Sequence, residues 1–190
     1  MKKTIIALTT IATFGMASSV MAADLPAGTA SFQWAGSVPS ATESGAGYFI
    51  IEEGNTGFTN GVLTFSNSAT DGIKLISSNE IGFKVVKDAA AGGDYNPATD
   101  VDPLAYTATL TSVKVGVNGF VAEQASDGYF NIYADGSKLT VNQANQISKA
   151  KSNNITRLTV APKDASANST LNAGDAVVVQ ALVAVNPTDV

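Results

Sequence analysis

The fold of this chain is decided by the stretch Ala30-Ser31-Phe32-Gln33-Trp34-Ala35-Gly36-Ser37-Val38-Pro39. Its even-numbered positions are Ala30, Phe32, Trp34, Gly36 and Val38, and Trp34 is the only tryptophan of the chain. Alternation with a period of two residues predicts a β-strand with one apolar face. Such a face has to be buried, either in the domain that carries the strand or in a neighbouring molecule.

Residues 1–22 have the pattern of a secretory signal peptide. Lys2 and Lys3 form a charged start, and the apolar run that follows is too short to span a bilayer. Val20-Met21-Ala22 provides small residues for cleavage after Ala22, with Ala23 as the near alternative. We therefore expect an exported protein in which residues 23–39 form an N-terminal extension and residues 40–190 form the domain.

The composition excludes several classes of function. The formal net charge is −5, and loss of the two signal-peptide lysines makes the chain still more acidic, which argues against nucleic acid and anionic membranes as partners. No later apolar run is long enough for membrane insertion. The chain has no cysteine, so it forgoes disulfides, and no histidine, so it lacks the usual general base and the commonest metal ligand.

Short strands separated by turns are predicted almost throughout. The predicted strands are 47–51, 61–65, 73–76, 81–87, 106–115, 129–133, 158–160 and 176–185, and a loop rich in Ala, Gly, Asp and Pro is predicted at about 88–102. Only residues 141–151 predict a helix, with Asn142 as its cap and Ala144, Ile147 and Ala150 on one side. The pattern indicates an all-β protein, an antiparallel β-sandwich.

Candidate chemistry is sparse. The loop at 94–102 clusters oxygen ligands as a calcium loop does, but it lacks the central glycine and closing glutamate of an EF-hand, and a solvated surface loop is the favoured interpretation. Glu52 and Glu53 are adjacent on a strand, so they point to opposite faces and cannot act as an acid–base pair. We predict no catalytic residue, no metal site and no cofactor, and therefore no enzyme.

The two ends of the chain favour polymerisation. Gly36 interrupts the apolar face of the 30–38 segment, and a glycine within a strand often marks the close approach of another backbone. The last predicted strand is followed only by a short tail that contains Pro187, so in an immunoglobulin-like sandwich the final strand would be missing and the edge of 176–185 open. The alternating row on that edge is Val177, Val179, Ala181, Val183 and Val185. Residues 30–38 are then an ordinary first strand, an exposed strand prone to aggregation, or a strand donated to another subunit.

The segment from Phe32 to Ser40 reads Phe-Gln-Trp-Ala-Gly-Ser-Val-Pro-Ser. It resembles the N-terminal extension of the major subunits of chaperone–usher fimbriae, and most of all that of colonisation-factor fimbrial subunits of enteric bacteria. The downstream layout is similar as well, with Val160-Ala161-Pro162-Lys163, then Ala173-Gly174, then the apolar final strand. Subunits of the disulfide-bearing type have a cysteine shortly after the donor strand, whereas Ser40-Ala41-Thr42-Glu43 stand here, so the resemblance is to the cysteine-free type.

The resemblance implies a fold and a set of partners. The fold would be an immunoglobulin-like antiparallel β-sandwich that lacks its last strand and is completed by a donor strand from a neighbouring subunit. The implied partners are a second copy of the chain in a head-to-tail homopolymer, a periplasmic chaperone and an outer-membrane usher, with a tip adhesin and a host receptor as further candidates. The implied location is a fimbria on the cell surface, reached through the periplasm.

A second hypothesis is a soluble secreted binding module, such as a carbohydrate-binding sandwich. It requires a sandwich that is complete by itself and a row of exposed aromatic residues, which Tyr95, Tyr106, Tyr129 and Tyr133 could supply. A tip adhesin is less favoured, because the residues after Ala22 leave no room for an additional receptor-binding domain.

Overall fold

The computed structural model describes residues 47–188, which belong to one compact unit, and apart from the single 3-10 turn Lys151–Asn153 their regular elements are all β-strands. The expected signal peptide and the segment 30–38 lie outside the described residues. The strands are β1 (Tyr48–Glu53), β2 (Leu63–Ser68), β3 (Gly72–Ser78), β4 (Ile81–Lys87), β5 (Tyr106–Val117), β6 (Phe120–Glu123), β7 (Phe130–Ala134), β8 (Ser137–Lys138), β9 (Ile147–Lys149), β10 (Ile155–Pro162) and β11 (Val177–Pro187). The prediction of an all-β protein is confirmed.

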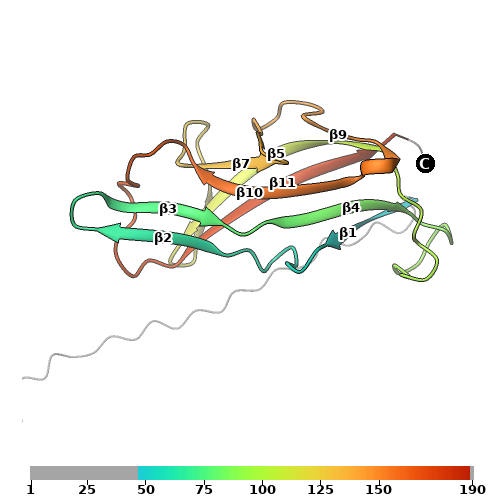
Figure 1. Cartoon of the computed structure of the whole chain (residues 1–190), viewed down its shortest axis with the longest axis horizontal. Coiled ribbons are helices and arrows are strands. Elements are labelled where there is room, and N and C mark those ends of the chain that lie inside the picture. The colour runs from blue at the N-terminus through green and yellow to red at the C-terminus, as the bar shows by residue number, and fades with distance from the viewer. Residues whose placement is uncertain (1–46, 189–190) are drawn as a thin grey trace, which may run out of the picture. The chain divides into compact units, whose positions relative to one another are not determined.

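The strands form two larger sheets and a hairpin, and every pairing is antiparallel. The first sheet has the order β1-β4-β10-β7-β8, and the second has the order β11-β5-β6, with β9 paired to the start of β5. Figure 1 shows β10, of the first sheet, passing in front of β11, of the second. Strands β2 and β3 make the separate hairpin. This layering is consistent with a β-sandwich.

The main core lies between the two sheets. Phe83 and Val85 of β4 and Ile132 of β7 pack against β5, whose Tyr106, Leu110 and Val113 are buried. Strand β5 contributes most because it is long and its buried residues alternate, apart from a bulge at which Thr111 is left out of the register with β11 and its hydroxyl donates to the Leu182 carbonyl at 3.0 Å. The buried hydroxyls of Tyr106 and Thr156 are hydrogen-bonded at 2.6 Å, so the polar groups in this core satisfy each other.

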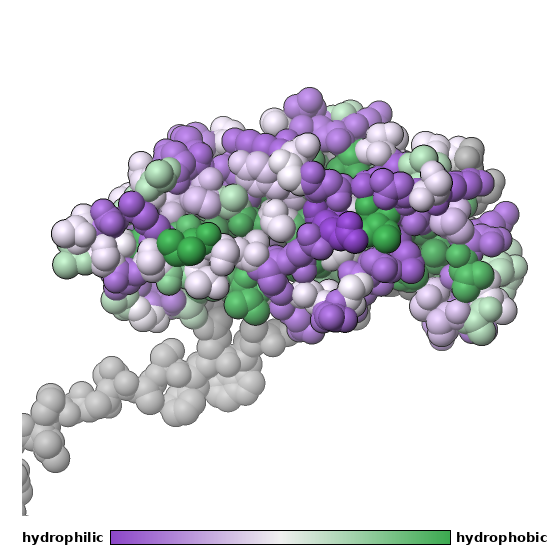
Figure 2. All heavy atoms as spheres, in the orientation of Figure 1, coloured by the Kyte–Doolittle hydropathy of each residue, from purple (hydrophilic) through white to green (hydrophobic). Residues whose placement is uncertain are grey.

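A second, smaller core lies under the β2–β3 hairpin. Leu75, Phe130 and Leu171 are its buried members. The Tyr129 hydroxyl accepts a hydrogen bond from the Leu75 N–H at 3.0 Å and so ties the hairpin to the residue before β7. On the face shown in Figure 2, hydrophilic residues predominate and the apolar patches are separate from one another. Residues 47–188 include no helix of the length and hydropathy needed to cross a membrane.

The prediction of a helix at 141–151 is wrong. Asn142 and Asn145 have φ angles of 61° and 56°, in the left-handed region that an α-helix cannot accommodate. Ile147, expected on the apolar side of that helix, is instead buried in β9, where it pairs with Ala108 of β5. A local helical periodicity over eleven residues was outweighed by the backbone pairing available at the start of β5.

Candidate functional site

Strand β11 is the longest edge strand among the described residues. It pairs with β5 over its whole length, from Val177↔Val117 to Pro187↔Tyr106, and no other strand within 47–188 pairs with its second side. The other edge strands of the two larger sheets are β1, β6, β8 and β9, with six, four, two and three residues, and the hairpin strands β2 and β3 have six and seven, against eleven for β11. A long edge of unpaired backbone groups is a template for pairing with another strand.

Hydrogen bonds at the two ends of β11 show which backbone groups face β5. The Ala176 carbonyl accepts the Asn118 N–H at 2.9 Å, and the Thr188 N–H donates to the Ala105 carbonyl at 2.9 Å. Even-numbered residues of this segment therefore turn their backbone groups toward β5. Because successive residues of a strand alternate, the odd-numbered residues direct their N–H and C=O groups toward the open edge.

The same odd-numbered residues carry the inward side chains, and they are the row that the sequence singled out. Val177 is half-buried against the smaller core, Val183 and Val185 against the main core, and Val179 against both. Ala181 pairs with the buried Val113, so it points to the same side, but it is exposed. The edge thus combines an apolar inward row with outward backbone groups, as a strand-pairing site requires.

The wall opposite β11 comes from two separate strands. Tyr48 and Ile50 of β1 pack against the same main core as Val183 and Val185. The Tyr48 hydroxyl donates to the Val185 carbonyl at 3.3 Å, so the edge of the first sheet lies next to the edge of the second. Leu63 and Phe65 of β2 pack against the same smaller core as Val177 and Val179, and Phe65 lines a cavity together with Val177. The sequence marked β1 and β2 as strands, but the face that each turns to β11 depends on contacts between residues far apart in the chain.

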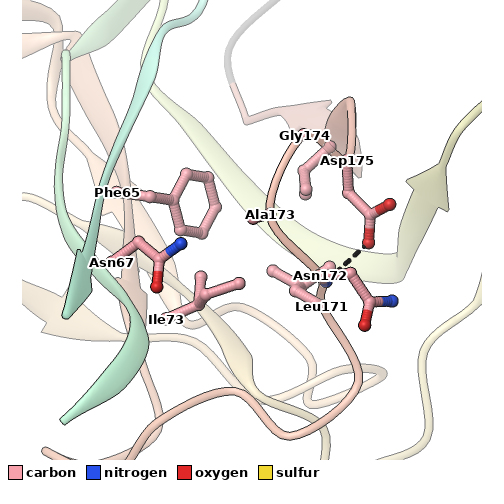
Figure 3. Close-up of a pocket in the computed structure, with 9 residues that line it drawn as sticks. Phe65, Asn67, Ile73, Leu171, Asn172, Ala173, Gly174 and Asp175 are labelled. Atoms are coloured by element: carbon pink, nitrogen blue, oxygen red, sulfur yellow. Dashed lines mark hydrogen bonds between the residues drawn. The ribbon is translucent and has the colours of Figure 1, made fainter. Parts of the chain in front are cut away.

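A cavity of about 160 Å³ lies at the Val177 end of this edge. Figure 3 shows Phe65, Asn67 and Ile73 of the hairpin on one side of it and the loop 171–175 on the other. The loop is held by Asp175, whose carboxylate accepts the Asn172 N–H at 2.7 Å and the Asn118 side-chain amide at 2.7 Å. The lining includes the apolar side chains of Phe65, Ile73, Leu171 and Val177, so the cavity suits an apolar group.

The acidic loop is built around two buried carboxylates instead of being solvated throughout. Asp100 is 2% exposed and accepts the N–H groups of Ala89 and Asn96 at 3.0 and 2.7 Å, while Asp88 accepts those of Ala90 and Gly92 at 2.9 and 2.8 Å. The hydrogen bonds from Asn96 and Ala89 lower the pKa of Asp100 below its ordinary value of 3.8. Within 47–188, no three acidic side chains converge on a common point where they could hold an ion. These carboxylates therefore act on the loop's own backbone.

The structure also places the other residues that the sequence singled out. Glu53 forms an ion pair with Lys84 at 2.7 Å, and Glu52 accepts the Phe58 N–H at 2.8 Å, so the two glutamates have separate structural roles. Tyr106 is buried, which prevents the four tyrosines from forming one exposed row. Tyr95 packs edge-on against Phe49, with 5.6 Å between the ring centroids.

The acceptor residues Val177, Val179, Ala181, Val183 and Val185 lie in one inward row of β11, whereas the donor residues Ala30, Phe32, Trp34, Gly36 and Val38 lie outside the described residues. Sequence reasoning missed Tyr48, Ile50, Leu63 and Phe65 as the opposite wall.

Comparisons of the chain with known families, curated proteins and solved structures find no match in any of the three. The geometry of the β11 edge is therefore the basis for a functional proposal.

Proposed function

We propose that this protein is a structural subunit that polymerises head to tail by adding residues 23–39 of one copy to the β11 edge of the next. One observation carries the proposal. The same five residues of β11 direct their backbone groups toward the open sheet edge and their side chains toward the core. The segment 30–38 has a complementary row of five alternating residues. Addition of an extended segment to a sheet edge uses backbone hydrogen bonds for affinity and alternate side chains for specificity.

The energetics of this contact favour the pairing of two apolar rows. The inward valines of β11 are half-buried and Ala181 is exposed, so each has apolar surface left to bury. Full burial of a side chain such as Phe32, Trp34 or Val38 contributes about 1.5–3 kcal/mol before the costs of association. The interface would join residues 23–39 of one copy to the β11 edge of another. Because these are two different surfaces, the contact propagates into a filament instead of closing.

The architecture in this proposal is an immunoglobulin-like sandwich completed by the added strand. Strands β1 and β11 are edges of different sheets and are bridged by the Tyr48 hydroxyl and the Val185 carbonyl. A strand paired with β11 would lie beside β1 and β2 and cover the inward row from Val177 to Val185. Its position is the one that a last strand of the second sheet would occupy.

The resemblance of the segment 32–40 to fimbrial donor strands extends the proposal to an assembly route. A periplasmic chaperone would cover the β11 edge first, and an outer-membrane usher would exchange it for the extension of the next subunit. The product is a surface fimbria that supports adhesion to host cells, directly or through a tip adhesin.

Refolding of the full chain without its signal peptide tests the proposal. The denatured protein is refolded at several concentrations, with and without an excess of a synthetic peptide spanning Asp24 to Pro39, and its mass is measured by light scattering. We expect long head-to-tail oligomers whose length increases with protein concentration, and a shift to monomers in the presence of the peptide. A peptide with Gly36→Leu is the matched control and is expected to leave the oligomers unchanged.

A chain that stays monomeric at every concentration and ignores the peptide contradicts the proposal. A monomer that is stable by itself would instead favour the secreted binding module. Thermal unfolding with and without the peptide distinguishes these results further, because a ligand that binds only the native state raises the melting temperature.

A further inference from the structure

The inward row of β11 is least covered at its centre, at Ala181, and this uncovered position is called the gap below. The four valines of the row are half-buried: Val177 packs against the smaller core, Val183 and Val185 pack against the main core, and Val179 packs against both. Ala181 is exposed, although its partner Val113 on the same side of the sheet is only 4% exposed. The middle position of the row is therefore the one that the described residues leave uncovered.

The gap arises because the opposite wall is interrupted. Strand β1 ends at Glu53 and β2 begins at Leu63, so the connection between them carries no strand. The inward side of β1 continues from Tyr48 and Ile50 to Glu52, which is exposed and has a side-chain oxygen bonded to the Phe58 N–H. Strand β1 therefore offers no apolar side chain on this side beyond Ile50.

The length of the donor row indicates which residue enters this gap. Five alternating residues, from Ala30 to Val38, would lie beside five alternating residues, from Val177 to Val185. Full overlap of the two rows places the central residue of one beside the central residue of the other, whether the strands run parallel or antiparallel. The central residues are Trp34, the largest of the donor row, and Ala181, the smallest of the acceptor row.

We propose that the gap at Ala181 is the subsite for Trp34 of the incoming strand and that it fixes the register of strand addition. The inference rests on the proposed function and specifies its site. A shift of the strand by two residues would move Trp34 beside a valine that already packs against a core, where extra volume is destabilising. In full overlap Gly36 instead lies beside Val179 or Val183, where a side chain has less room.

Size exchange between the two positions tests the inference in the full chain without its signal peptide. Ala181→Leu fills the gap, and Ala184→Leu makes the same change on the other face of β11 and is the matched control. After refolding, we expect Ala181→Leu to lower the yield of oligomers at least about tenfold, and Ala184→Leu to leave it within about twofold of the wild type. Trp34→Ala is expected to lower the yield as well, and the double variant Trp34→Ala/Ala181→Leu to assemble at least about threefold better than either single variant, as coupled neighbours do.

Fluorescence gives a second readout, because Trp34 is the only tryptophan of the chain. In wild-type oligomers its emission is expected to shift to shorter wavelength and to be protected from acrylamide, and Ala181→Leu is expected to weaken both effects in the oligomers that remain. Normal assembly of Ala181→Leu, or a double variant no better than the single ones, overturns the subsite while the proposed function stands. Failure of both the wild type and Ala184→Leu to assemble overturns the proposed function itself.

Discussion

Asp100 shows how one residue stabilises the longest loop of the described chain. Its carboxylate receives the backbone N–H groups of Asn96 and Ala89, and these bonds hold its pKa below 3.8 in the folded protein. A carboxylate with a lowered pKa contributes stability above its unfolded pKa, and that contribution is lost as the pH falls through the folded value. The loop is thus held by an ionised group at neutral pH.

Asp100→Asn is expected to lower the melting temperature at about pH 7, because a neutral amide is a weaker acceptor for the two N–H groups. The difference from the wild type is expected to shrink below pH 3.8, where the wild-type contribution is itself being lost. Thermal unfolding followed by circular dichroism between about pH 7 and about pH 2.5 measures this. The exposed Asp94→Asn is the control, and a difference that does not depend on pH would contradict the assignment.

Along strand β11, backbone groups that face β5 alternate with backbone groups that face the open edge. The N–H of Ala181 faces the open edge, whereas the N–H of Ala184 faces β5. Ala181→Pro is therefore expected to leave the pairing with β5 intact but to prevent strand addition, whereas Ala184→Pro removes a ladder bond. We expect Ala184→Pro to be about 1–3 kcal/mol less stable than Ala181→Pro in urea unfolding, because it also leaves a β5 acceptor unpaired. Equal losses in the two variants would show that the assignment of the edge is wrong.

The elements that could be predicted from the sequence are those whose pattern is local. The bounds of β4 coincide with its predicted range of 81–87, and the starts of β5 and β11 lie within one residue of prediction. Strand β6 was missed, although the turn before it, Asn118-Gly119 with φ angles of 52° and 91°, is a strong hairpin signal that could have revealed it. Strand β9 could not be found this way, because Ile147 becomes a strand residue only by pairing with Ala108.

In the candidate site, too, the part that follows from a local pattern could be predicted and the part that depends on distant contacts could not. The inward row of β11 follows from alternation within one strand. The opposite wall depends on Tyr48 meeting Val185, a contact between residues 137 positions apart. The exposure of Ala181 depends on where β1 ends and β2 begins. No periodicity within a strand contains that information, so the gap could be recognised only in the folded chain.

In the proposed filament, residues 30–38 of one copy would pair with β11 of the next copy. Gly36→Leu is expected to abolish filament formation in cells by steric clash at the acceptor edge, while export of the subunit continues. Trp34→Asp is expected to have the same effect, because it would bury a charge in an apolar site. Electron microscopy of the cell surface and immunoblots of periplasmic extracts measure the two effects. Normal filaments from either variant would show that residues 30–38 are not the donor strand.

The orientation of the outward backbone groups has a mechanical consequence. The groups of Val177, Val179, Ala181 and Val183 point sideways from β11, so hydrogen bonds to an added antiparallel strand would lie across the strand axis. A tensile load along that axis would act on all of these bonds in shear and at the same time, whereas a load across the edge would open them one after another. A filament joined in this way would resist pulling along its length far more than peeling at its joints.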